Sequence, residues 1–206
     1  MYTLNDDRTI EYGWMRENLG HGDGWVLDLG TPAGYPTQED AISKGWNVLS
    51  IDLRGDPFEH PNHIHVVGDF NQIELGRKFD YVLNVSSIEH FGLAGRYGVT
   101  VADPDADIHA MEKLAKVMKP GAQMVLTIPV GVDRIFSPWH RVYGDLRFHQ
   151  LIRPFTVLKA RFWVKRGGID KYVEGSRDEA FGTMPQAPPD HYYALGGFVL
   201  GVPPNG

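Results

Sequence analysis

The clearest pattern in the chain is a series of short apolar runs, each followed by a polar or glycine-containing turn. The runs show little of the alternation that a half-exposed strand would have, which is typical of strands buried on both faces of a parallel sheet. We expect five such strands at residues 25–29, 47–51, 64–67, 79–85 and 123–128, and two further strands at residues 156–164 and 195–202.

Helical spacing of apolar residues fills several of the gaps between these strands. Helices are expected at residues 8–19, 37–44 and 105–118. Alternation of strands and helices predicts a doubly wound α/β domain, with a seven-stranded, mostly parallel sheet and helices on both faces. No clear helix separates the last two strands, so we expect them to form an antiparallel pair, with an antiparallel last strand, that closes the edge of the sheet. Residues 166–192 are expected to form a long loop, as a lid or as a contact in a homodimer.

Composition and charge narrow the class of protein. The 206 residues include no cysteine, which excludes a disulfide framework, a thiolate zinc site and a cysteine nucleophile. The net charge of −6 argues against a broad nucleic-acid surface, although residues 141–166 are basic. No apolar run is long enough to span a bilayer, and residues 1–8 lack the order of a signal peptide. We therefore expect a cytoplasmic protein that binds neither nucleic acid nor membrane.

The turn after the first strand is the first candidate for a ligand site. It reads Asp28-Leu29-Gly30-Thr31-Pro32-Ala33-Gly34. In an open parallel sheet, ligands bind beyond the carboxyl ends of the strands, and glycines let the backbone approach them closely. The turn carries neither the Gly-x-Gly-x-x-Gly signature of dinucleotide sites nor the Gly-Lys-Ser/Thr of a phosphate-binding loop. Taken alone, it is equally well a simple turn.

Five motifs in order along residues 23–131 resemble those of class I S-adenosylmethionine-dependent methyltransferases, which have a Rossmann-like fold. The turn at residues 28–34 resembles the first motif, with Pro32 in place of its central glycine. Asp52 ends the second strand, like the acid that binds the ribose hydroxyls by charge-assisted hydrogen bonds. Gly68-Asp69-Phe70 resembles the motif that reads the adenine amine. The remaining two motifs are Phe79–Asn84 and the approach to Lys119-Pro120-Gly121.

This resemblance implies S-adenosylmethionine as the cofactor and divides the single domain 1–206 into three parts. These are an N-terminal helix or lid (1–22), a cofactor-binding core (23–131), and substrate-side elements with the final strand pair (132–206). The residues that it assigns to the cofactor are Asp28, Gly30, Thr31, Pro32, Gly34, Asp52, Leu53, Gly68, Asp69, Phe70, Asn84, Val85 and Ser86. Asp52 and Asp69 could instead cap local turns. Pro32 removes an N–H and stiffens the loop, so the methionine end is expected to be held differently here.

The stretch after the fourth strand holds the best candidates for chemistry. His90 is expected to be the general base, because an imidazole with a pKa near 6.5 can accept a proton at neutral pH. Glu89 is its expected partner, and the alternative is that the two residues only hold a loop together. His140 rivals His90 as the base.

A second cluster, at residues 129–144, combines aromatic, imidazole and guanidinium groups, as a polar substrate pocket requires. Trp139, Arg141 and Tyr143 are expected to bind substrate, although the aromatics could equally be core residues. With residues 86–92 and 103–107, the cluster resembles a little-studied group of methyltransferase-like proteins linked to surface-polysaccharide or sugar modification.

The sequence therefore predicts methyl transfer from S-adenosylmethionine to a small polar acceptor, an oxygen nucleophile on a sugar or related metabolite. The alternatives are an N-methyltransferase for a small amine and a non-catalytic, cofactor-binding scaffold. No metal site is expected, because the histidines of residues 60–65 have no carboxylate nearby to complete a ligand set. Residues 11–14 of the first helix are expected either to cover the cofactor or, at Trp14, to anchor the core.

Overall fold

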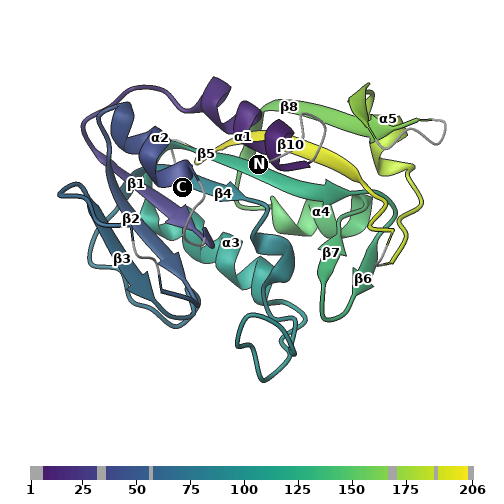
Figure 1. Cartoon of the computed structure of the whole chain (residues 1–206), viewed down its shortest axis with the longest axis horizontal. Helices are drawn as coiled ribbons and strands as arrows, with labels where there is room; N and C mark the ends of the chain where they lie inside the picture. Colours follow the sequence, from purple (N-terminus) through teal and green to yellow (C-terminus); the bar gives the residue numbers. More distant parts are fainter. Residues whose placement is uncertain (1–6, 32–35, 56–57, 167–170, 188–189, 204–206) are drawn as a thin grey trace.

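An eight-stranded sheet forms the centre of the molecule in a computed structural model that describes residues 7–31, 36–55, 58–166, 171–187 and 190–203. Its strand order is β3 (His63–Val67), β2 (Asn47–Asp52), β1 (Trp25–Leu29), β4 (Phe79–Val85), β5 (Met118–Val130), β10 (Ala194–Gly201), β8 (Thr156–Lys165) and β9 (Tyr172–Gly175). Strands β1 to β5 run parallel, whereas β10 is antiparallel to both of its neighbours (Figure 1).

All seven predicted strands are present, and the Rossmann-like, mostly parallel sheet with an antiparallel last strand is confirmed. The predicted number of strands is one too low, because β9 lies in the stretch that the sequence predicts to be a loop. β9 has only four residues and is stabilised by pairing with β8, a contact that its own sequence does not reveal. The predicted antiparallel pair is formed by β8 and β10, with β10 inserted between β5 and β8. β9 adds one more strand beyond β8 and forms the edge of the sheet.

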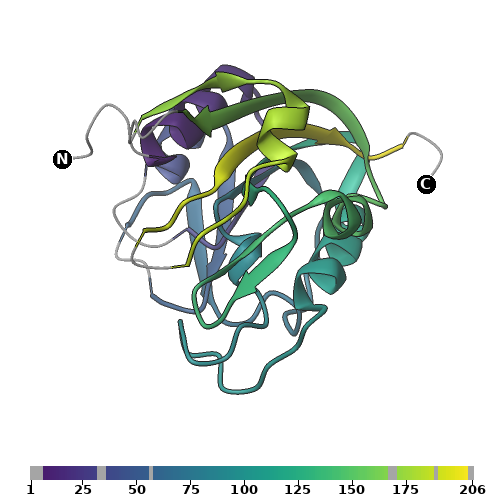
Figure 2. The same ribbon diagram turned by 90° about the vertical axis from the view of Figure 1, so that its right-hand side faces the viewer.

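Helices cover both faces of the sheet, as predicted. Successive strand residues point to opposite faces, so Leu27 and Val26 belong to two different hydrophobic clusters. The cluster around Val26 is covered by α1 (Asp7–Asn18) and α2 (Thr37–Ser43). The cluster around Leu27 receives side chains from α3 (Ala106–Val117), α4 (Asp145–Leu151) and α5 (Arg177–Phe181). Figure 2 shows α1 and the pair α3 and α4 on opposite sides of the sheet.

Trp14 anchors α1 on the sheet. Its indole is buried, and Nε1 donates a hydrogen bond to the Phe198 carbonyl oxygen at 3.4 Å. The ring lies against Gly197, where an added Cβ would come within 3.0 Å of it. The anchoring role that the sequence left open for Trp14 is therefore the one observed. Other residues of α1 lie at the cavity described below.

The region after β5 contains elements that the sequence analysis did not predict. Strands β6 (Arg134–Phe136) and β7 (His140–Val142) form a separate two-stranded hairpin, and α4 follows them. Each of these elements has at most seven residues, too short for a periodic pattern to stand out. Among the described residues, no helix combines the length and the apolar character needed to cross a membrane.

Candidate functional site

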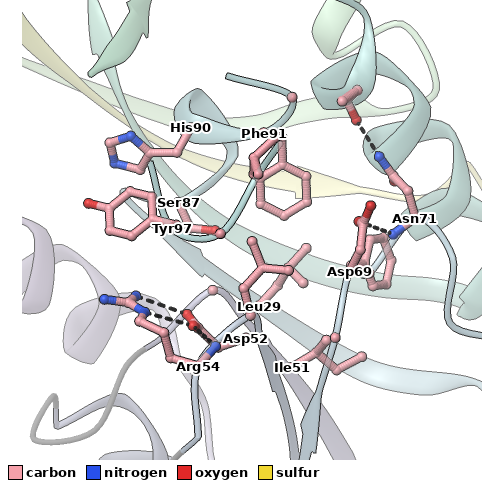
Figure 3. Close-up of a pocket in the computed structure, with 18 of the residues that line it drawn as sticks. Leu29, Ile51, Asp52, Arg54, Asp69, Asn71, Ser87, His90, Phe91 and Tyr97 are labelled. Carbon is pink, nitrogen blue, oxygen red and sulfur yellow. Dashed lines mark hydrogen bonds and ion pairs between the residues drawn. The ribbon is translucent and has the colours of Figure 1, made fainter. Parts of the chain in front are cut away.

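A cavity of about 700 Å³ opens beyond the carboxyl ends of β1, β2, β3 and β4. This volume lies in the range of small-molecule sites, and the position is the one at which open parallel sheets bind ligands. Figure 3 shows its walls, with Leu29 and Ile51 at the strand ends and Asp52, Asp69 and His90 arranged around them.

The turn after β1 forms the floor of the cavity. Gly30 has a φ of 76°, and an added Cβ would collide with Ser87 Oγ, so only glycine fits there. Asp28 does not line the cavity. Its carboxylate is buried and accepts hydrogen bonds from the hydroxyls of Thr31 at 2.6 Å and Thr37 at 2.7 Å, which ties the two ends of the turn together. Of the predicted residues, Pro32 and Gly34 lie outside the described part of the chain.

Asp52 ends β2 at the cavity wall and is paired with Arg54. The guanidinium donates to both carboxylate oxygens, at 2.9 and 3.1 Å, and the Arg54 backbone N–H donates at 2.8 Å. Arg54 also lies over the ring of Tyr97, 4.7 Å from its centroid (Figure 3). Leu53 lines the cavity beside this pair.

The segment after β3 forms another wall. Gly68, Asp69 and Phe70 all line the cavity. Asp69 Oδ1 accepts a hydrogen bond from the Asn71 backbone N–H at 2.9 Å, so the turn-capping role is present. Phe70 is buried, with the Lys113 ammonium 4.8 Å from its ring centroid.

The segment after β4 brings a strained residue and an unpaired hydroxyl to the cavity. Val85, Ser86 and Ser87 line it, and Ser86 has a φ of 49°, a conformation that few residues other than glycine adopt. Ser87 Oγ is buried and has no hydrogen-bond partner among the described residues. Asn84 is buried and does not line the cavity, and its Oδ1 accepts a hydrogen bond from the Ile88 N–H at 3.2 Å.

His90 reaches the cavity from the 3-10 helix Ile88–His90. Nδ1 lies 2.6 Å from the Trp139 carbonyl oxygen, so it carries the proton and donates it, and Nε2 is left as the basic nitrogen of the neutral ring. Burial lowers the pKa of His90, and this effect outweighs the opposing effect of the Glu89 carboxylate. The lowered pKa favours the neutral ring at pH 7. Glu89 is buried behind it, with Oε1 3.7 Å from His90 Nε2.

The predicted substrate residues do not line the cavity. Trp139 is partly exposed beside Arg96, and its carbonyl orients His90. His140 is buried, and burial lowers its pKa to about 4. Tyr143 belongs to the core, and its hydroxyl donates to Asp107 at 3.1 Å.

Arg141 is buried and acts as a clamp on the loop 92–103. Its guanidinium donates to the backbone carbonyls of Phe91, Asp103 and Pro104, which flank or end this loop. The Asp103 N–H also donates to the Gly92 carbonyl at 3.0 Å, so the ends of the loop meet. The loop protrudes at the bottom of Figure 1 and contributes to the cavity wall, for example with Tyr97 and Val101.

Several residues of the site escaped the sequence analysis. They belong to α1, to the residues next to Asp52 and Asp69, and to the loop 92–103. These residues are Arg8, Arg54, Asn71, Gln72, Tyr97, Val99, Thr100 and Val101. One usable signal was the run of glycines at 92, 95 and 98, which marks a loop between the fourth strand and the helix after it.

Solved structures with this fold include several methyltransferases. One is 1,6-didemethyltoxoflavin-N1-methyltransferase from Burkholderia thailandensis with bound S-adenosylhomocysteine, at TM-score 0.65 and 15% identity over 95% of this chain and 78% of that one. A second is the N-methyltransferase NodS from Bradyrhizobium japonicum with S-adenosylhomocysteine, at TM-score 0.61 and 16% identity over 97% and 90%. A third is a methyltransferase-like protein from Bacillus halodurans, at TM-score 0.63 and 13% identity over 95% and 99%. At these identities the likeness shows a shared fold.

A search among curated proteins finds no match. A family model, described as "Caenorhabditis protein of unknown function, DUF268", matches residues 62–166, from β3 to β8. The matched region contains the ends of β3 and β4, His90, the loop 92–103 and the Arg141 clamp, and it spans just over half of the chain. The chain therefore belongs to the DUF268 family.

Proposed function

We propose that this chain is an S-adenosylmethionine-dependent methyltransferase that acts on a small polar acceptor, with His90 as the general base. The observation that carries the proposal is the shared cavity: Asp52 ends β2 on one wall, and the basic nitrogen of His90 belongs to another. Two neighbours of the same fold were crystallised with S-adenosylhomocysteine, which supports this choice of cofactor.

The residues of the cavity fit this cofactor. The turn at Gly30 leaves room that a side chain would fill, and the buried Ser87 hydroxyl lacks a partner among the described residues. Asp52 would hold the ribose hydroxyls, and Asp69 and Phe70 would lie at the adenine ring. Gly30 and Ser86 would lie at the methionine portion. When bound, the cofactor supplies an electrophilic methyl group. Pro32 would then mark a difference from related enzymes in how the methionine portion is held.

His90 would take the proton of the acceptor. Its Nε2 is unprotonated at neutral pH, because Nδ1–H is committed to the Trp139 carbonyl and burial lowers the pKa of the ring. His140 is the weaker candidate for the base, since it is buried and does not line the cavity. An acceptor hydroxyl gives up its proton only as its oxygen forms the new bond, so a base within hydrogen-bond reach accelerates the step.

We propose an oxygen nucleophile on a sugar or related metabolite as the acceptor. An amine is the alternative, and the names of the toxoflavin enzyme and NodS, both N-methyltransferases, favour it. A non-catalytic scaffold would keep the cofactor site without turnover.

Calorimetry with S-adenosylhomocysteine and with NAD tests the cofactor. We expect the wild-type chain to bind S-adenosylhomocysteine and to ignore NAD, and Asp52→Asn to weaken binding by about tenfold or more, since a hydrogen bond to a charged group contributes ~1.5–3 kcal/mol. Asp178→Asn is the matched control, because Asp178 is exposed on α5 and does not line the cavity. Binding of NAD alone would overturn the proposal.

Methyl transfer from isotope-labelled S-adenosylmethionine to panels of sugars and amines tests the reaction. We expect a methylated sugar or related hydroxyl compound, and His90→Gln should lose turnover while it keeps S-adenosylhomocysteine binding. Methylation of amines alone would replace the oxygen acceptor by the alternative. Binding without turnover on either panel would favour the scaffold.

A further inference from the structure

A continuous line of hydrogen bonds connects α1 with the segment that carries His90. It begins at Glu11, whose carboxyl group is buried and accepts a hydrogen bond from Arg8 Nη1 at 2.8 Å. The other Glu11 oxygen, Oε1, accepts the hydroxyl of Thr127, a β5 residue, at 3.2 Å. Glu11 does not line the cavity, so it has no place in the binding of cofactor or acceptor described above.

Thr127 is in turn hydrogen-bonded to Ser86. The Ser86 backbone N–H donates to Thr127 Oγ1 at 3.0 Å and to the Thr127 carbonyl oxygen at 3.1 Å. These bonds hold Ser86 at its positive φ of 49°, a conformation that is strained for a residue other than glycine and persists only where neighbours enforce it. In this conformation the Ser86 hydroxyl donates to Glu89 Oε1 at 2.7 Å. The same oxygen of Glu89 lies 3.7 Å from His90 Nε2.

We propose that Glu11 is a positioning residue for His90: through Thr127 and Ser86 it holds the Glu89 carboxylate beside the basic nitrogen of the imidazole. The proposal rests on the proposed function only for the role of His90 as base, because the geometry itself involves no ligand. It gives Glu11 a positioning role in addition to the packing of α1 on the sheet.

The protonation of Glu11 fits this role. Burial raises its pKa to about 8, against the opposing effect of Arg8, so at neutral pH the group is mostly the uncharged acid. An uncharged Glu11 can hold Thr127 without placing a second negative charge next to Glu89. The charged groups that act on His90 itself are Glu89, which favours the imidazolium, and Arg96 and Arg8, which oppose it; Tyr97 packs against the ring, and His140 lies near it.

Histidine titration by NMR tests the proposal without cofactor or acceptor. The chain would be labelled at histidine Cε1, and the His90 signal would be assigned by its loss in His90→Gln. We expect Glu89→Gln to lower the titration midpoint of His90 by about one pH unit or more, as loss of a carboxylate within 4–6 Å does. Thr127→Val and Glu11→Ala should lower it in the same direction, although neither residue touches His90.

Two further variants separate positioning from a general loss of structure. Glu11→Gln resembles the protonated acid and keeps an acceptor for Thr127, so its His90 midpoint should stay near that of the wild-type chain. Glu17→Ala is the matched control on the same helix, because Glu17 pairs with Lys159 and Arg161 at the surface. If Glu11→Ala does not fold, Thr127→Val gives the same test with α1 unchanged.

A wild-type midpoint in Glu11→Ala, or in Thr127→Val where Glu11→Ala does not fold, would overturn the proposal, and so would a wild-type midpoint in Glu89→Gln. Failure of the chain to bind S-adenosylhomocysteine would remove the proposed function but leave these titrations unchanged. The two proposals can therefore fail separately.

Discussion

Arg54 holds the carboxylate of Asp52 in a two-pronged ion pair, with Nε and Nη2 at 2.9 and 3.1 Å from its two oxygens. The Arg54 side chain is about half exposed, whereas that of Asp52 is only 6% exposed. Asp52 is the acid proposed to bind ribose hydroxyls, so a nucleoside that enters the cavity competes with Arg54 for the same oxygens. The contact of Arg54 with Tyr97 couples that competition to the loop 92–103.

We expect Arg54→Ala to tighten S-adenosylhomocysteine binding, because the carboxylate no longer has to be released from its partner. A partly exposed ion pair contributes up to about 1 kcal/mol, so the expected gain is at most about fivefold. Calorimetry measures it, and Arg77→Ala is the control, since Arg77 stacks on Trp25 away from the cavity lining. Weaker binding in Arg54→Ala would mean that the guanidinium itself holds the ligand.

Gly30→Ala should disable the cofactor site. The new methyl group collides with Ser87 Oγ and the residue is held at a φ of 76°, so we expect a stability loss of roughly 1–3 kcal/mol and loss of S-adenosylhomocysteine binding. Urea unfolding and calorimetry measure the two effects. Adding Ser87→Gly should restore part of the stability by removing the collision, while Gly76→Ala, with open space around it, should behave like the wild type. No improvement in the double variant would argue against the collision.

Arg141→Met should release the loop 92–103. The substitution leaves backbone carbonyls without their donor and Asp107 with one guanidinium fewer, so we expect a loss of about 3–5 kcal/mol, as for a broken buried ion pair. Urea unfolding gives the stability. Relative to the wild type, hydrogen exchange in Arg141→Met should increase more in the loop 92–103 than in the sheet. Arg134→Met, at an exposed position of β6, should change stability by less than about 0.5 kcal/mol. Equal effects of the two variants would contradict the clamp.

Glu11 should make the fold less stable as the pH rises toward 8. Its pKa is raised from 4.5 to about 8, so between these values the folded chain holds a proton that the unfolded chain releases. Stability from this group is therefore greatest below pH 4.5 and falls until about pH 8, by at most ~1.4 kcal/mol per pH unit. Glu11→Gln cannot titrate, so its unfolding free energy should increasingly exceed that of the wild type over this range. Parallel curves for the two chains would show that Glu11 is ionised throughout.

His140 should have the opposite effect in acid. Its pKa is lowered from 6.5 to about 4, so the unfolded chain binds a proton that the folded chain excludes between these values. Stability should therefore be lost as the pH falls from 6.5 to 4. His140→Phe keeps a ring between Phe136 and Tyr193. Its melting temperature should therefore drop less between pH 7 and pH 4.5 than that of the wild type. A control at the exposed His21, His21→Gln, should lose as much as the wild type.

The sequence predicts most of the central sheet well because the strands at its centre carry their own signal. β1, β2, β4 and the second half of β5 are buried on both faces, and residues buried on both faces must be apolar almost without interruption. The prediction of these strands also placed Asp52, Asp69 and His90 together, because parallel strands bring their carboxyl ends to one edge of the sheet. β9 carries no such signal.

The rest of the site depends on contacts between distant parts of the chain. Arg8 reaches the cavity only because Trp14 anchors α1 on β10. Arg141 has the chemistry of a substrate-binding residue, but its guanidinium is used by the carbonyls of the loop 92–103. Nothing in the residues next to Arg141 distinguishes these two uses, because the carbonyls lie about forty residues away in the sequence.

The position of β10 has a consequence for the order in which the molecule is completed during synthesis. β10 follows all the other described strands along the chain, yet it lies between β5 and β8, and α1, which precedes those strands, is anchored to it through Trp14 and Phe198. A nascent chain in which β10 is still inside the ribosome therefore lacks the strand on which α1 packs, and Arg8 and Glu11 are not yet brought to their places. The proposed active site should form only after β10 has left the ribosome, and a ribosome stalled before β10 should carry a chain that cannot bind S-adenosylhomocysteine.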